Sequence, residues 1–214
     1  GRPSRGASAV GDALVAERNP ARLAGALAAS GDAVGALARD TAFLSALERP
    51  QAEALVVHLR RSGNAAALLE VARNIDGPIA ARAVEAIGPS RAGVDAEKLQ
   101  ALAQSKPAVA PSVLAILGPN DRDALAWLEG LLADEALGAN AALALQRVDA
   151  IAAREAAARA LASGDVVAAR RALLMLMNDG GVEARAIVAA FAESDPSDAS
   201  MQRLQARSAQ WLSE

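Results

Sequence analysis

The sequence predicts an all-α fold, arranged as an α-solenoid of about six antiparallel helical hairpins. The first observation is composition: 53% of the 214 residues are hydrophobic but only 2% are aromatic. Apolar content therefore comes from Ala, Leu and Val, and Ala and Leu lose little rotamer freedom in a helix. The second and third observations are a helix-start signal that recurs about every 30 residues and a short break inside each repeat.

Prolines mark most of the predicted helix starts. They occur at near-constant spacing, at Pro20, Pro50, Pro78 and Pro107. Proline is well tolerated at the first helical position, where its missing N–H would have no partner anyway. The series continues without proline at Glu135 and Asp165, and proline returns at Pro196.

Each repeat contains two predicted helices. In the repeat opened by Pro78, the first runs to about Ile87 and stops at "GPS", and the second begins with "DAEKLQALAQS" at Asp95. The next repeat follows the same plan with "PAVAPSVLAIL", the break "GPN" and "DRDALAWLEGLLAD". Two helices joined by so short a connection lie antiparallel.

The hydrophobic pattern explains why hairpins would stack. Over residues 182–193 one helical face collects the apolar side chains of Ala184, Ile187, Val188 and Phe191. Charged residues occupy the opposite face, namely Glu183, Arg185 and Glu193. A single hairpin cannot bury such a stripe, whereas stacked neighbours can.

The first-helix segments "GPIAARAVEAIG" and "DVVAARRALLML" share an arginine followed by small and then larger apolar residues. They resemble the short bacterial HEAT-like repeat of the phycobilisome-lyase type, with its pattern (D)P-x-x-R-x-x-A-x-x-A-L/I-G. The matching positions are Pro78, Arg82, Ala83, Ala86, Ile87 and Gly88. The resemblance implies a HEAT-like superhelix over residues 18–194. Residues 1–17 are then an N-terminal tail and capping helix, and residues 195–214 are a C-terminal capping helix.

Composition argues against several classes of function. The chain has no Cys, and His58 is its single histidine, so cysteine chemistry and multi-histidine zinc sites are excluded. No motif for catalysis or cofactor binding is present, and we expect no enzyme activity, no metal and no cofactor. A net charge of −3 makes nucleic acid an unexpected partner. No apolar run is long enough for a membrane span.

Five residues are candidates for partner binding: Trp127, Arg154, Arg159, Arg170 and Arg171. The arginines lie in a basic segment between two acidic ones, which is typical of a site for anions or peptide carboxylates. An exposed Trp would be a natural anchor for a peptide. The alternatives are inter-repeat packing for Trp127 and solvated helix surfaces for the arginines.

The leading prediction is therefore a non-catalytic scaffold, in which the second helices line a concave surface that binds a protein or peptide. A nucleic-acid reader similar to HEAT-like alkylpurine glycosylases stays open, as does a cofactor lyase or chaperone-like factor. Because the chain begins at Gly1 without Met, we expect a processed and exported fragment. The oligomeric state is not predicted.

Overall fold

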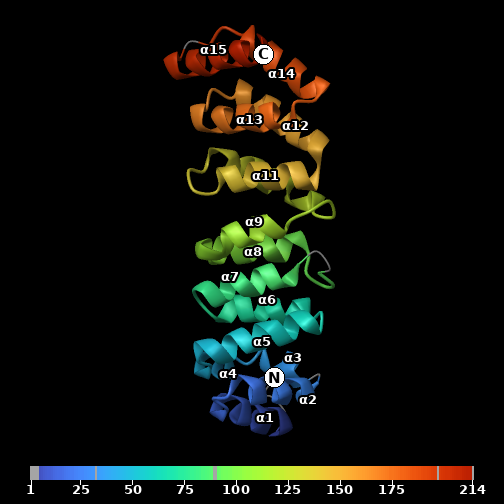
Figure 1. Ribbon diagram of the computed structural model, residues 1–214. Coiled ribbons are helices and arrows are strands. Elements are labelled where there is room, and N and C mark those ends of the chain that lie inside the picture. The colour runs from blue at the N-terminus through green and yellow to red at the C-terminus, as the bar shows by residue number, and fades with distance from the viewer. Residues whose placement is uncertain (1–4, 32, 89–90, 197, 214) are drawn as a thin grey trace. The chain divides into compact units, whose positions relative to one another are not determined.

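The computed structural model describes residues 5–31, 33–88, 91–196 and 198–213 (Figure 1). Its contacts divide the chain into unit 1 (Gly1–Ile116) and unit 2 (Leu117–Glu214). In the described residues all regular structure is helical, which confirms the all-α prediction. None of the helices found there is both long and apolar enough to cross a membrane.

Unit 1 is built from nine α-helices and one 3₁₀ segment in its described residues. They are α1 (Arg5–Ala16), α2 (Pro20–Ser30), α3 (Ala33–Leu37), α4 (Thr41–Ala46), α5 (Arg49–Arg61), α6 (Ala65–Asn74), α7 (Pro78–Ile87), α8 (Ala96–Ser105), η1 (Pro107–Val109) and α9 (Ala110–Ile116). Helices near in sequence pack together, as in the pairs α5–α6, α6–α7, α5–α7, α7–α9 and α8–α9. The core between them is aliphatic, with Leu55, Leu68, Leu99 and Leu114 almost fully buried.

Helix starts in unit 1 follow the proline signal. Helix α2 begins at Pro20 and α7 at Pro78, Pro50 occupies the second position of α5, and Pro107 opens the short segment before α9. Helix α7 ends at Ile87, and Gly88 follows with φ +61°, a conformation that glycine adopts without a Cβ penalty. These boundaries were predicted from the proline and glycine positions.

Long polar side chains connect helices far apart in sequence by capping helix ends. The buried Gln51 of α5 donates from Nε2 to the carbonyls of Val15 (2.7 Å), in the last turn of α1, and Glu17 (3.1 Å), which follows α1. Lys106 donates from Nζ to the carbonyls of Ala72 (3.2 Å) and Ile75 (2.9 Å) at the end of α6. Both satisfy carbonyl groups that a helix C-terminus leaves without an intrahelical partner.

Unit 2 has two layers in its described part. Its elements are η2 (Arg122–Ala124), α10 (Leu125–Gly130), η3 (Leu131–Ala133), α11 (Gly138–Val148), α12 (Ala150–Ala162), α13 (Val166–Asp179), α14 (Val182–Ala192) and α15 (Ala199–Ser213). The first helices form one layer, in which α11 contacts α13 and α13 contacts α15 (Figure 1). The second helices form the other layer, in which α12 contacts α14. Small residues such as Ala144, Ala157 and Ala169 lie in the core and allow close helix approach.

An aspartate precedes each of the first helices α11, α13 and α15. One carboxylate oxygen of Asp134, Asp165 or Asp198 accepts hydrogen bonds from the backbone amides two and three residues later, at 2.8–3.0 Å. For Asp165 and Asp198 this is the usual arrangement at a helix start, whereas Asp134 binds the turn that leads into α11. The fifth and ninth residues after each aspartate are exposed alike in α11, α13 and α15.

The segment 121–134 differs from its predicted single helix. It forms the short elements η2, α10 and η3. Asp121 is buried, and its carboxylate accepts from the amide of Gly118 at 2.7 Å, so it stabilises the preceding turn and does not cap a following amide. Helical periodicity in the sequence could not reveal this change because the apolar spacing of α and 3₁₀ turns is similar over so few residues.

Candidate functional site

Arg154, one of the predicted binding arginines, forms ion pairs that connect α12 with α13 and α14. From α12 its guanidinium contacts Asp179 at the end of α13 (3.0 Å) and Glu183 on α14 (2.9 Å). Its side chain is only 20% exposed. Arg154 is therefore engaged in contacts within unit 2.

Arg159 forms a two-pronged ion pair with Glu129 of α10. Its Nε lies 2.7 Å from Oε1 and its Nη2 lies 2.8 Å from Oε2. The bond lowers the pKa of Glu129 and raises the pKa of Arg159, since each charge stabilises the other. Such bidentate pairs fix geometry as well as charge.

Arg171 is used for helix capping, as Gln51 and Lys106 are in unit 1. Its guanidinium donates to the carbonyls of Leu132 (2.6 Å) and Glu135 (2.9 Å), around the end of η3. The group lies directly over Gly138, where an added Cβ would come within 2.6 Å of the guanidinium carbon. Only glycine leaves room for this contact.

Arg170 and Trp127 have different surroundings. Arg170 is exposed on α13, and no hydrogen bond or ion pair is found for its side chain in the described part of the chain. Trp127 is half-buried on α10. All five candidate residues lie in unit 2, but Arg154, Arg159 and Arg171 each contact a different partner, so the structure does not gather them into one cluster.

An apolar groove lies between the second helices α12 and α14. It has a volume of 300 Å³ and is lined by Ala158, Leu161, Ala162, Ile187, Ala190, Phe191 and Ser194. Leu161 and Phe191 form its buried floor, while Ala162 and Ala190 are exposed at its sides. The Ser194 hydroxyl donates to the Phe191 carbonyl at 2.7 Å, which leaves the groove with few groups to orient a polar ligand.

A second recess, of 460 Å³, continues from this groove. It shares Leu161, Ala162, Phe191 and Ser194 with the groove and adds residues of the α14–α15 turn, including Asp195 and Asp198. Asp198 is occupied by its helix-start hydrogen bonds, whereas Asp195 is exposed. The two recesses form one surface depression beside α12 and α14, which we call the second-helix groove.

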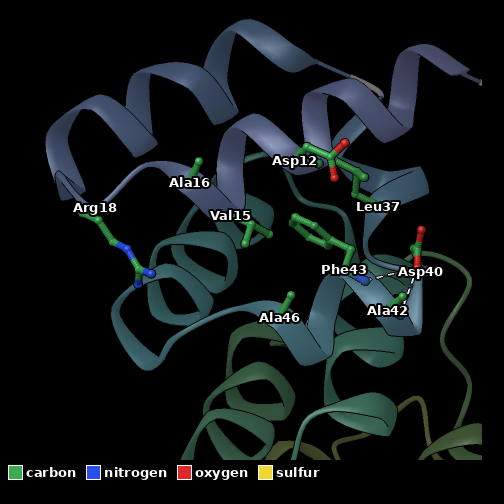
Figure 2. A pocket seen from close by; sticks show the side chains of 10 residues that line it. Asp12, Val15, Ala16, Arg18, Leu37, Asp40, Ala42, Phe43 and Ala46 are labelled. Carbon is green, nitrogen blue, oxygen red and sulfur yellow. Dashed lines mark hydrogen bonds between the residues drawn. The ribbon is translucent and has the colours of Figure 1, made fainter.

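Unit 1 has a pocket of its own near α1 and α4, with a volume of 460 Å³ (Figure 2). The ring of Phe43 points toward Val15 in its interior, and the charged side chains of Asp12 and Arg18 lie at its edge. Asp40 caps α4 by accepting from the amides of Ala42 and Phe43. Its carboxylate is therefore committed to local structure.

His58, Met175 and Trp211 pack against neighbouring parts of the chain. His58 is half-buried in α5, and Met175 is buried in α13. Trp211 is half-buried in α15 and lies under the guanidinium carbon of Arg185, 4.7 Å from the ring centre. Across the described ranges, no three His, Cys, Asp or Glu side chains gather as metal ligands would.

Comparison of the chain with models of protein families, with characterised proteins and with solved structures gives no match.

Sequence reasoning missed the residues that line the second-helix groove, above all Leu161, Ala162 and Ala190. Their apolar character predicts burial, and only the packing of α12 against α14 leaves a depression over them. It also missed Leu143 and Leu174, which are 55% and 38% exposed. Their separation of 31 residues, close to the repeat length, was the available signal.

Proposed function

We propose that the chain is a non-catalytic interaction module, an α-solenoid of about six HEAT-like hairpins that binds a segment of a protein partner on its second helices. The contacts of helices with near neighbours in sequence support the repeat arrangement. So do the polar contacts between side chains about one repeat apart, for example Arg82 with Glu53 and Arg159 with Glu129.

The observation that carries this proposal is the second-helix groove. Its floor is apolar, and its accessible sides are made by alanines, so a large apolar side chain from a partner can enter without displacing a bulky neighbour. The groove is open and has few free polar groups, whereas small-molecule sites combine enclosure with several orienting polar groups. A peptide anchored by one or two apolar side chains suits it better.

The occupant we propose is an apolar anchor followed by a basic residue. The anchor would contact Leu161 and Phe191, and the basic side chain would lie near the exposed Asp195 at the other end of the groove. Charge at the rim would contribute mainly to specificity and association rate, and the buried anchor to affinity.

A random peptide display library tests the proposal directly. Selection on the wild-type chain should enrich peptides that carry a large apolar residue next to Lys or Arg. Ala190→Glu places a carboxylate in the groove and should weaken the enriched peptides by about tenfold or more. The matched control is Ala186→Glu, an exposed position on the same helix outside the groove, which should leave binding unchanged.

Enrichment of no peptide, or equal binding to the Ala190→Glu and wild-type chains, would contradict this proposal. Tighter binding of an oligonucleotide at the same groove would favour the nucleic-acid alternative instead.

A further inference from the structure

A second surface of unit 2 lies on its first helices. Counted from the aspartate that precedes each helix, the fifth and ninth residues are exposed on α11, α13 and α15 alike. These six residues are Ala139, Leu143, Arg170, Leu174, Arg203 and Arg207. We call them the first-helix surface.

The three helices lie side by side, because α11 contacts α13 and α13 contacts α15. Packed helices are about 8–10 Å apart, so the surface extends for about 20 Å from α11 to α15. Equivalent positions in the repeat thus form two short rows across the helices. An extended peptide rises about 3.3 Å per residue, so about six residues would cross them.

The chemistry changes along these rows. At α11 both positions are apolar, at α13 one is Arg170 and the other Leu174, and at α15 both are arginine. Leu143 and Leu174 are large apolar side chains that the fold leaves in solvent. No described ion pair or hydrogen bond involves the side chains of Arg170, Arg203 or Arg207.

No carboxylate neutralises this surface from the same helices. The described parts of α11 and α15 contain no Asp or Glu, and Asp179 of α13 is paired with Arg154. Asp134, Asp165 and Asp198 at the helix starts accept hydrogen bonds from backbone amides. The surface is therefore locally cationic within a chain of net charge −3.

We propose that the first-helix surface docks an acidic protein segment that crosses α11, α13 and α15, with apolar residues over α11 and carboxylates over α15. Guanidinium groups bind carboxylates bidentately, which suits Arg203 and Arg207. The exposed leucines favour a protein segment over nucleic acid, because phosphate binding gains nothing from them. This surface is separate from the second-helix groove and does not depend on it.

Selection from a random peptide library tests the inference on a chain in which Ala190→Glu blocks the second-helix groove. We expect enriched peptides with net negative charge and with apolar residues toward one end. Substitution of Arg170, Arg203 and Arg207 by Glu should weaken them by about tenfold or more and should instead enrich basic peptides. Leu143→Ser with Leu174→Ser should weaken the same peptides while preserving their acidic character.

The matched control replaces three exposed arginines of unit 1, Arg22, Arg39 and Arg60, by Glu. It changes the net charge by the same amount as the triple substitution of Arg170, Arg203 and Arg207. It should retain the acidic peptides, and circular dichroism should show that all variants stay helical.

Three outcomes of the selection would overturn the inference. They are failure to enrich any peptide, enrichment of peptides without acidic residues, and an equal loss of binding in the control. A labelled oligonucleotide that binds more tightly than the peptides and is lost in the Arg170, Arg203 and Arg207 variant would also overturn it. Because the groove is blocked throughout, failure of the proposed groove function would not produce any of these results.

Discussion

Units 1 and 2 join their helices through similar polar contacts but differ in the surface that they leave exposed. In unit 1, Lys106 caps the end of α6, and in unit 2 Arg171 caps the end of η3 in the same way. Yet of six large apolar side chains exposed in the described residues, Val57 alone lies in unit 1. The other five are Leu143, Ile151, Val167, Leu174 and Val182.

This difference separates the requirements of stability from those of binding. Packing neighbouring helices needs buried aliphatic side chains and capped helix ends, which both units have. Exposed leucine and valine add nothing to either requirement. Leu143 and Leu174, two of the five exposed side chains of unit 2, belong to the first-helix surface, and the second-helix groove also lies in unit 2.

The largest expected effect contrasts two leucines on one helix. Leu145 of α11 is 1% exposed and Leu143 is 55% exposed. Leu145→Ala should lower the free energy of unfolding by about 2–5 kcal/mol because it leaves a cavity in the core. Leu143→Ala should change it by no more than about 0.5 kcal/mol.

Urea denaturation followed by circular dichroism measures both changes. If the two variants lost similar stability, Leu143 would be part of the core, and the first-helix surface would lose its apolar end. The affinity for an acidic peptide should fall more in Leu143→Ala than in Leu145→Ala, because Leu143 lies on the first-helix surface.

The sequence predicted the helices better than the surfaces. Pro78 and Gly88 bound α7 because both act locally, one through its ring and the other through its positive φ. The roles of Arg154 and Arg171 depend on residues 25 to 39 positions away in the chain. A local charge count cannot distinguish an arginine that caps a neighbouring helix from Arg170, which is exposed.

The same limit applies to the second-helix groove. Ile187 and Phe191 were predicted to share an apolar helix face, but whether neighbouring helices close over them depends on side-chain size at Ala158 and Ala190. Periodicity reports which residues face inward. It does not report how completely two helices fill the space between them.

A second comparison contrasts two glycines of unit 2. A Cβ on Gly138 would collide with the Arg171 guanidinium, whereas a Cβ on Gly130 meets nothing within 4 Å. Gly138→Ala should displace Arg171 and lower the free energy of unfolding by about 1–3 kcal/mol. Gly130→Ala, at a helical φ of −60°, should leave stability unchanged or raise it by up to about 1 kcal/mol. Thermal unfolding of both variants distinguishes these outcomes, and equal behaviour would show that the Arg171 cap is not formed.

Lys106 in unit 1 and Arg171 in unit 2 both cap a helix end, and we expect the two caps to contribute equally to stability. Lys106→Met and Arg171→Met keep the apolar stem but remove the donors, and each should cost about 1–2 kcal/mol in urea denaturation. Lys98→Met is the control because Lys98 is exposed and pairs only within its own helix start and the preceding loop. If only one of the two variants lost stability, the caps would not contribute equally in the two units.

The smallest effect concerns acid sensitivity and the ion pair of Glu129 with Arg159. Because this pair lowers the pKa of Glu129 in the folded chain, its contribution to stability is present above the unfolded pKa and is lost as pH falls through the lowered folded pKa. Glu129→Gln should cost about 0.2–1 kcal/mol at neutral pH and should flatten the decline in urea midpoint below about pH 5.

In unit 1 the Lys106 ammonium likewise lowers the pKa of Asp76, so Asp76→Asn should flatten the same decline, but less, because Asp76 is 93% exposed. If Glu129→Gln left the pH profile unchanged, the bidentate pair would contribute geometry between α10 and α12 without contributing stability.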